Sequence, residues 1–169
     1  KFPFFFDNQI PSKIAQKLNY QVFRPGIIME GGSVDFNGEG TLITTKSCLL
    51  NKNRNSNLTQ KEIEWYLCEF YGVDQIIWLE GGIAGDDTDG HVDDITRFVK
   101  PDTVITMIET NTNDENYEIL KKNYNILRNT YLLNNKKLEI VEIPMPQPIY
   151  YGDIRLPASY ANFYITNSS

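Results

Sequence analysis

The chain has 169 residues, of which 41% are hydrophobic and 12% aromatic, and its formal net charge is -6. This composition predicts one folded domain over residues 1–169 and argues against disorder. The acidic balance disfavours nucleic acids and anionic membranes as partners, because both attract basic patches, and no apolar run has the length that crosses a bilayer. With two cysteines and no disulfide framework, the expected compartment is the reducing cytoplasm.

The first half of the chain carries signals for both helices and strands. The pattern predicts a helix over residues 11–18 and four short strands, over residues 20–23, 27–29, 33–36 and 41–45. The last two strands flank a glycine-containing turn and form a predicted hairpin. Thr59 and Glu62 have the spacing of a capping box, so a helix is expected from residue 60 until Gly72 ends it.

The second half continues this mixture. The pattern predicts a long helix over residues 116–133 and strands over residues 75–79, 95–99, 103–108, 138–143 and 161–165. Four prolines within residues 144–157 predict irregular structure there. The sequence shows no tandem repeat. Short strands with intermittent helices favour an α/β or α+β fold with a mixed sheet.

Residues 85–94 hold five carboxylates and the only histidine of the chain. Carboxylates this close repel one another unless a metal, a cationic ligand or a proton relieves them. The segment is therefore either a binding site for something positive or a well-solvated acidic loop, and composition leaves both open. A calcium loop is disfavoured, because Thr96 stands where the EF-hand pattern needs a bidentate glutamate. One histidine among carboxylates is also a thin ligand set for zinc.

Within this segment, His91 and Asp93 are the first candidates for chemistry. Two positions apart on an extended backbone, their side chains would face one pocket. There the histidine would act as a general acid or base, and the carboxylate would tune it or hold a cation. A turn at residues 88–90 would bring Asp86 or Asp87 back beside them.

Four residues outside the acidic segment bear on its function. Glu30 follows a predicted buried strand and precedes two glycines that would let a ligand approach closely. Arg54 belongs either to a plain polar loop or to a clamp on acidic neighbours. Cys48, on a strand-like run, and Cys68, within the capped helix, are both expected to be buried structural thiols.

Five segments together resemble the agmatine deiminases, which belong to the bacterial peptidylarginine-deiminase-type guanidine-modifying enzymes. The segments, in order, are residues 29–33, 49–55, 77–79, 85–93 and 156–165. The resemblance implies a pentein fold, a propeller of five ββαβ-type units, of which this chain would form roughly the middle ones. It also implies hydrolysis of agmatine to N-carbamoylputrescine and ammonia, through an amidine formed on a cysteine thiolate.

The resemblance assigns roles to four residues of this chain. His91 would protonate the leaving ammonia and activate water, and Asp93 and Asp87 would bind the guanidinium. Glu30 would line or support the site. No metal and no cofactor are expected, because the substrate supplies the positive charge. The expected partner is a small guanidinium compound, with neither nucleic acid nor membrane, and a homo-oligomer is left open.

The chain departs from the family pattern at the nucleophile. The cysteine of the family lies in a Gly-rich His-Cys segment, and a further guanidinium-binding aspartate lies in an Arg-Asp motif; neither motif is present here. Cys48 and Cys68 are in unrelated contexts, so we expect these residues alone to be inactive. Three alternatives stay open: a protein-arginine deiminase, a cation- or polyamine-binding module, and a structural domain with a solvated acidic loop.

Overall fold

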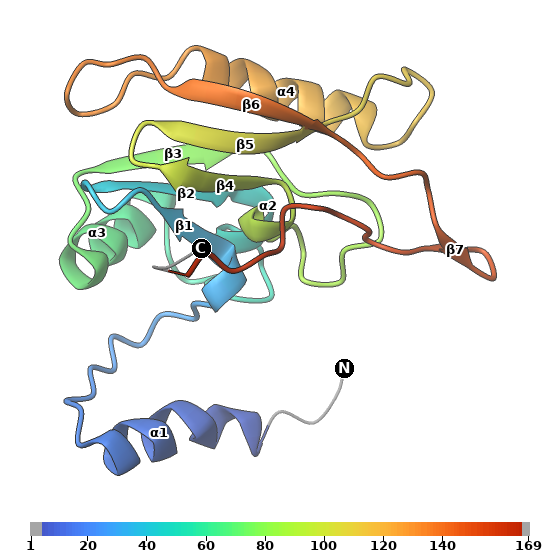
Figure 1. The fold of residues 1–169 in the computed structure, drawn as a ribbon. Coiled ribbons are helices and arrows are strands. Elements are labelled where there is room, and N and C mark those ends of the chain that lie inside the picture. Colours follow the sequence, from blue (N-terminus) through green and yellow to red (C-terminus); the bar gives the residue numbers. More distant parts are fainter. Residues whose placement is uncertain (1–4, 167–169) are drawn as a thin grey trace.

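The computed structural model describes residues 5–166 and contains two stretches with the same order of elements (Figure 1). The first comprises β1 (Val34–Phe36), β2 (Thr41–Thr45), α3 (Gln60–Tyr71) and β3 (Gln75–Leu79), and the second β4 (Thr96–Lys100), β5 (Thr103–Ile108), α4 (Tyr117–Arg128) and β6 (Glu139–Pro144). In each, the first two strands are antiparallel, and the third, after the helix, is parallel to the second. The structure thus contains a repeat of topology that the sequence did not show.

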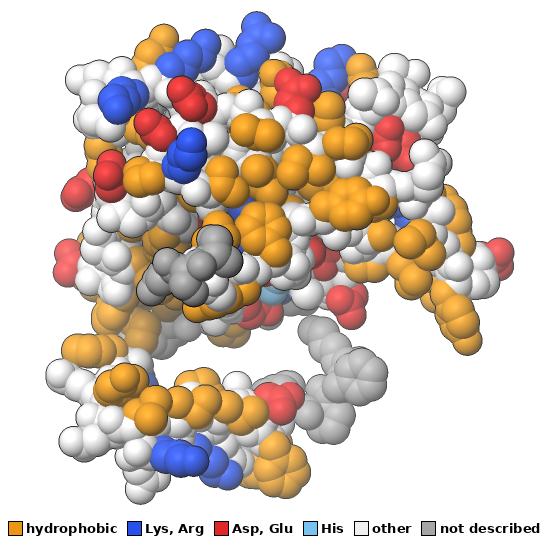
Figure 2. Space-filling model, viewed as in Figure 1, with side chains coloured by type: hydrophobic (Ala, Val, Ile, Leu, Met, Phe, Trp, Pro, Cys, Tyr) orange, Lys and Arg blue, Asp and Glu red, His pale blue; other side chains and the backbone are white. Residues whose placement is uncertain are grey.

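The other elements are short. They are α1 (Ile10–Leu18), α2 (Lys46–Leu49), the 3-10 turns η1 (Asp7–Gln9), η2 (Gly31–Ser33) and η3 (Val92–Asp94), and a small hairpin of β7 (Tyr150–Tyr151) and β8 (Ile154–Arg155). An extended segment joins α1 to the rest of the protein (Figure 1). Figure 2 shows hydrophobic side chains along α1, where Ile10, Ile14 and Leu18 are 49%, 51% and 52% exposed. None of the described helices is long and apolar enough to span a bilayer.

The two central strands, β2 and β5, form the hydrophobic interior. Every residue of β2 and all but the last residue of β5 are buried. Each lies between two other strands of its sheet, and its apolar side chains pack with those of the helices in two buried clusters, so water is excluded from both strands. The predicted mixed α/β class is therefore confirmed, with two three-stranded sheets and the two-stranded β7–β8 sheet in place of one mixed sheet among the described residues.

Helix boundaries follow from local chemistry. Thr59 and Glu62 form the predicted capping box, and Gly72, with φ at 64°, ends α3. The predicted long helix was too long, since α4 ends at Arg128. The next two side chains, Asn129 and Thr130, bond back to carbonyl oxygens four residues earlier, and such bonds compete with helix continuation.

Three predicted strands were wrong. Residues 20–23, 27–29 and 161–165 are not strands, and the first two lie on the segment that leaves α1. Their β-branched and aromatic residues fit an extended backbone, but among the described residues no neighbouring strand pairs with them. The run that contains Cys48 was expected to be strand-like, but it forms the short helix α2. Thr45 caps this helix by accepting a hydrogen bond from the Cys48 amide.

A buried carboxylate joins the two repeated units. Asp35 on β1 accepts hydrogen bonds from the Phe98 amide (2.6 Å) and from Nε of Arg97 (2.7 Å), both on β4. Burial raises the pKa of Asp35, and these two donors offset part of that rise. The bonds hold β1 beside β4, and with them the segments that precede each strand.

Candidate active site

Two turns that precede neighbouring strands form the centre of the site. The turn η2 leads into β1, and η3 lies just before β4. Because β1 and β4 are joined through Asp35, η2 and η3 pack against each other. This packing brings Glu30 next to His91 and Asp93, although Glu30 lies 61 positions before His91 in the sequence.

The imidazole ring of His91 lies between two carboxylates. Its Nε2 is 3.3 Å from Oε2 of Glu30, and its Nδ1 is 4.0 Å from Oδ1 of Asp93. The side chain is 13% exposed. Figure 2 shows the only histidine of the chain beside acidic side chains, on the side of the protein that faces α1. A ring with a carboxylate near each nitrogen can take up a proton and pass it on.

The structure confirms that His91 and Asp93 face one side, but the predicted reason was wrong. The prediction assumed an extended backbone, whereas Val92 begins a 3-10 turn and its side chain is fully buried in the core. The turn, anchored by this apolar residue, is what directs both polar side chains toward Glu30 and η2.

Asp93 has an oxygen that lacks a partner. Its Oδ1 is buried and has no hydrogen-bond donor among the described residues. Burial raises the pKa of this carboxyl, while the positive charges of His91 and Arg97 oppose the rise. A buried acceptor without a donor is costly, so this atom is suited to accept from the N–H of a bound cation.

The raised pKa of Asp93 gives a testable dependence of stability on pH. The folded state holds this proton more tightly than the unfolded state, so the free energy of unfolding falls as pH rises above the ordinary value of 3.8. The variant Asp93→Asn removes that loss. We expect its free energy of unfolding, relative to wild type, to increase from roughly pH 4 to pH 7 in urea titrations. If the difference in free energy of unfolding between the variant and wild type is constant or decreases with pH, the raised pKa of Asp93 in the folded state is contradicted.

Gly32 allows His91 and Asp93 to lie against the backbone of η2. A Cβ at this position would be 2.6 Å from Nδ1 of His91 and 2.6 Å from Oδ2 of Asp93. At Gly31, a Cβ would meet no atom within 4 Å. Of the two glycines that follow Glu30, only the second is therefore required by close packing of the site.

Arg54 acts as the clamp that was one of its two predicted roles. Its Nε and Nη2 donate to the two oxygens of Glu30 at 2.5 and 3.1 Å, and its Nη1 donates to Asp89 at 2.9 Å. Nη2 also donates to the Thr88 carbonyl at 2.6 Å. Although burial raises the pKa of Glu30, the hydrogen bonds from Arg54 and His91 hold it below its ordinary value. Glu30 is therefore an ionised, oriented carboxylate.

Two neighbouring carboxylates of the acidic segment have different environments. Asp86 accepts from the amides of Thr88, Gly90 and His91 at 2.8, 2.9 and 3.1 Å, so it is the residue that folds the turn. Asp87 is exposed and has no hydrogen-bond or ion-pair partner among the described residues. Sequence reasoning left Asp86 and Asp87 as alternatives beside His91, and the structure places Asp86 there.

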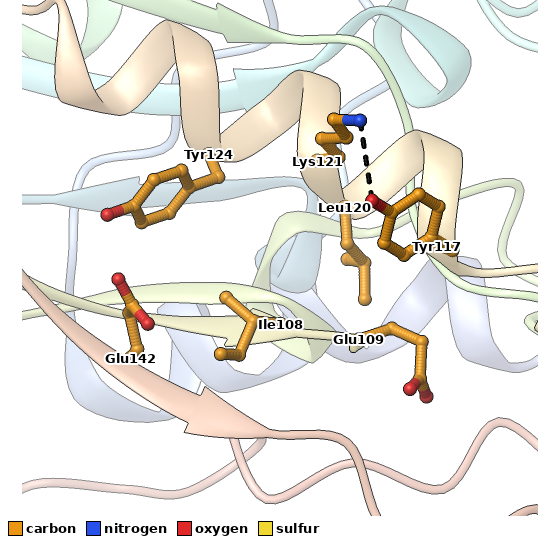
Figure 3. A pocket seen from close by; sticks show the side chains of 7 residues that line it. All are labelled: Ile108, Glu109, Tyr117, Leu120, Lys121, Tyr124 and Glu142. Atoms are coloured by element: carbon orange, nitrogen blue, oxygen red, sulfur yellow. Dashed lines mark hydrogen bonds between the residues drawn. The ribbon is translucent and has the colours of Figure 1, made fainter. Parts of the chain in front are cut away.

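Asp87 instead lines a cavity of about 590 Å³ at the other side of Glu30. Its walls are formed by Asn8, Ile28, Met29, Glu30, Asn53, Arg54, Asp87, Thr88 and Asp89. Two smaller hollows, of about 180 and 240 Å³, lie elsewhere and contain none of the predicted site residues. Figure 3 shows the first of them between α4 and the strands β5 and β6, with Lys121 hydrogen-bonded to Tyr117. The larger cavity is the one adjoining the predicted chemistry.

A C-terminal strap, residues 154–163, holds the acidic segment in place. Ser159 Oγ donates to the Asp94 carbonyl at 2.5 Å, and Asn162 donates to the Asp94 carboxylate at 3.2 Å. The Arg155 carbonyl packs on Gly85, where a Cβ would lie at 2.3 Å. Sequence reasoning singled out this strap only through the family resemblance and expected a strand there, so it missed the contacts with Asp94.

The two cysteines differ in environment. Cys48 is fully buried, as predicted, and burial raises the pKa of its thiol to about 12. Its Sγ lies 4.0 Å from Oε2 of Glu30, a proximity that no local sequence signal indicated. The prediction for Cys68 was wrong, because it lies on the exposed side of α3. Neither thiol is poised as a thiolate nucleophile.

A family model for Porphyromonas-type peptidyl-arginine deiminases matches residues 1–169. The chain belongs to this family. Solved structures similar to this chain have the same fold. The C. jejuni agmatine deiminase, solved as a cysteine-to-serine variant with substrate bound, has a sequence 41% identical to this chain and a TM-score of 0.89. The match covers 100% of this chain and 50% of that one. The agmatine deiminase of Enterococcus faecalis is 27% identical, with a TM-score of 0.85, covering 99% and 47%.

Among curated proteins of the peptidyl-arginine deiminase family, the agmatine deiminase of Pseudomonas fluorescens is 37% identical over 180 residues, covering 95% of this chain and 49% of that protein. The chain spans about half the length of the curated relatives it matches. The resemblance seen in the sequence is thereby confirmed at the level of the family, and the mixed α/β fold is that of its solved members.

Proposed function

We propose that this chain forms the guanidinium-binding and proton-transferring part of an agmatine deiminase. The observation that carries the proposal is the position of His91 between Glu30 and Asp93, whose buried Oδ1 accepts from no donor within residues 5–166. A guanidinium group offers planar N–H donors that match carboxylate acceptors. The site therefore combines an acceptor for the substrate cation with a group that moves protons.

In this proposal each residue has one task. Asp93 accepts from the guanidinium, and burial makes its carboxylate a strong partner for a cation. His91 gives a proton to the departing ammonia and then takes one from the attacking water. Glu30, oriented by Arg54, holds Nε2 of His91. Asp87 contributes negative charge from the wall of the adjoining cavity.

The reaction also needs a thiolate that attacks the guanidinium carbon. Cys48 is buried with its pKa at about 12, and Cys68 lies on the exposed side of α3. We propose that neither serves as the nucleophile, so the 169 residues alone release no ammonia from agmatine. The two ββαβ units would be adjacent blades of a pentein propeller, an arrangement that their shared topology supports.

Agmatine is preferred over peptidyl-arginine as the substrate because the cavity beside Glu30 holds about 590 Å³ and is lined by three carboxylates. Acidic walls suit a ligand that carries a second, amine cation, whereas a peptide would place neutral backbone there. The P. fluorescens relative carries the agmatine deiminase name. A protein-arginine deiminase is the alternative, and it would citrullinate peptides without turning over agmatine.

The test is ammonia release from agmatine by the complete gene product. We expect His91→Asn to lower kcat by about 100-fold or more, as expected for loss of a general acid–base. Cys68→Ser serves as the control and should retain activity, because Cys68 lies on the exposed side of α3 and outside the acidic segment. Citrulline formation on peptides without turnover of agmatine would overturn the substrate assignment. Loss of activity in Cys68→Ser or Cys48→Ser, in a variant that unfolds at the wild-type urea concentration, would overturn the assignment of the nucleophile.

A further inference from the structure

Three side chains beside the acidic segment bring three metal-binding atoms together. They are Oε2 of Glu30, Sγ of Cys48 and Nε2 of His91, and all three atoms lie within 4.8 Å of one another. The oxygen is 3.3 Å from the histidine nitrogen and 4.0 Å from the sulfur. A carboxylate, a thiol and an imidazole are all ligands that zinc accepts.

We propose that these three side chains form a binding site for a thiophilic divalent cation, Zn²⁺ in particular. Bond lengths of about 2.0 Å to N or O and about 2.3 Å to S place tetrahedral ligand atoms about 3.3 Å apart for N and O, and about 3.5 Å apart for S and O. The first separation matches the observed 3.3 Å, and the second requires the sulfur to approach Glu30 by a few tenths of an ångström from 4.0 Å.

The protein holds these ligands in place before any metal binds. Cys48 lies in α2, whose first turn is capped by Thr45, and its side chain is fully buried. Glu30 is oriented by Arg54, and His91 is 13% exposed. Glu30 also lines the large cavity, so its carboxylate can be reached by a cation from there.

The charges around the sulfur favour a cation. The charged groups that act on Cys48 are the three carboxylates of Glu30, Asp86 and Asp89 and one guanidinium, that of Arg54. Burial raises the pKa of the Cys48 thiol, so the thiol stays protonated until a metal displaces the proton. A thiolate and a carboxylate would supply two negative charges to the metal, and Arg54 would remain bonded to the Glu30 carboxylate. Thiol coordination also selects zinc over calcium and magnesium.

Occupation of this site would inhibit the enzyme, a consequence that rests on the proposed function. The metal would bind Nε2 of His91 and the Glu30 oxygen that holds this nitrogen, and so would fix the ring that transfers protons. The site would therefore link activity to the concentration of free zinc.

The binding site is tested with Co²⁺, a coloured substitute for zinc that shows a thiolate-to-metal absorption band only when sulfur binds it. The 169-residue chain should show this band, and Zn²⁺ should abolish it. Cys48→Ser should lose the band, whereas Cys68→Ser, which removes the only other thiol, should keep it. Absence of the band in wild type, or its persistence in Cys48→Ser, overturns the proposal.

A second pair of variants covers the case in which Cys48→Ser does not fold. Glu30→Gln should lower the Co²⁺ affinity by about tenfold or more, while Glu39→Gln, in the exposed hairpin turn, should not change it. Equal affinities in both variants would exclude Glu30 as a ligand and overturn the site. These spectra need no catalysis. A complete gene product that does not turn over agmatine, together with a 169-residue chain that shows the band, would therefore refute the proposed function and leave the metal site intact.

Discussion

Gly32→Ala is expected to lower kcat/KM of the complete protein for agmatine by about 100-fold, because it displaces both reacting side chains. The added Cβ would lie 2.6 Å from His91 and 2.6 Å from Asp93. Both atoms belong to side-chain ends, which can move, so stability should fall by only about 1 kcal/mol. The change is measured by steady-state kinetics, together with urea unfolding.

The neighbouring glycine provides a matched control. Gly31→Ala adds the same methyl group one residue earlier in the same turn, where nothing lies within 4 Å, and should leave kinetics unchanged. His91 is the only histidine, so its ring signals in an NMR spectrum report the displacement directly. They should shift in Gly32→Ala and not in Gly31→Ala. Similar kinetics and spectra for the two variants would show that Gly32 is not needed to accommodate the pair.

The fold was predictable where local signals and burial agree. The strands at residues 75–79 and 103–108 and the helix at residues 60–71 were predicted with the observed bounds. Each is an apolar or capped segment, and the two strands also find neighbouring strands to pair with. Residues 20–23 and 161–165 have strand-like composition, but a strand also needs a neighbour to pair with, and that is decided by the tertiary structure.

The site shows the same division between local and distant information. His91, Asp93 and the alternative roles of Arg54 were apparent from residue types and spacing. The proximity of Cys48 to Glu30 and His91 was not, because it depends on α2 packing against η2 and the acidic segment. Likewise, no spacing in the sequence distinguishes Asp86 from Asp87. The carboxylate of Asp86 accepts hydrogen bonds from backbone amides, whereas Asp87 is exposed.

The largest expected loss of stability follows from removing the buried guanidinium. Arg54→Met should reduce the free energy of unfolding by about 3 kcal/mol, at the lower end for a broken buried ion pair. Its side chain is 7% exposed, and it separates the carboxylates of Glu30 and Asp89, each 40% exposed. Methionine retains most of the apolar stem but leaves both carboxylates without their counter-charge. Because partial exposure lets water solvate them, a loss at the upper end is not expected.

Lys46→Met is the matched control, since it makes the same change of charge and adds the same side chain. Lys46 bonds to Glu80 at 2.6 Å, but the two side chains are 41% and 38% exposed. An exposed pair of this kind contributes about 0–1 kcal/mol, so the control should unfold at nearly the wild-type urea concentration. The Arg54→Met deficit should also shrink as pH falls, because protonation of Glu30, whose pKa Arg54 holds low, removes the repulsion. Equal losses in the two variants would mean that Arg54 contributes no more than a surface charge.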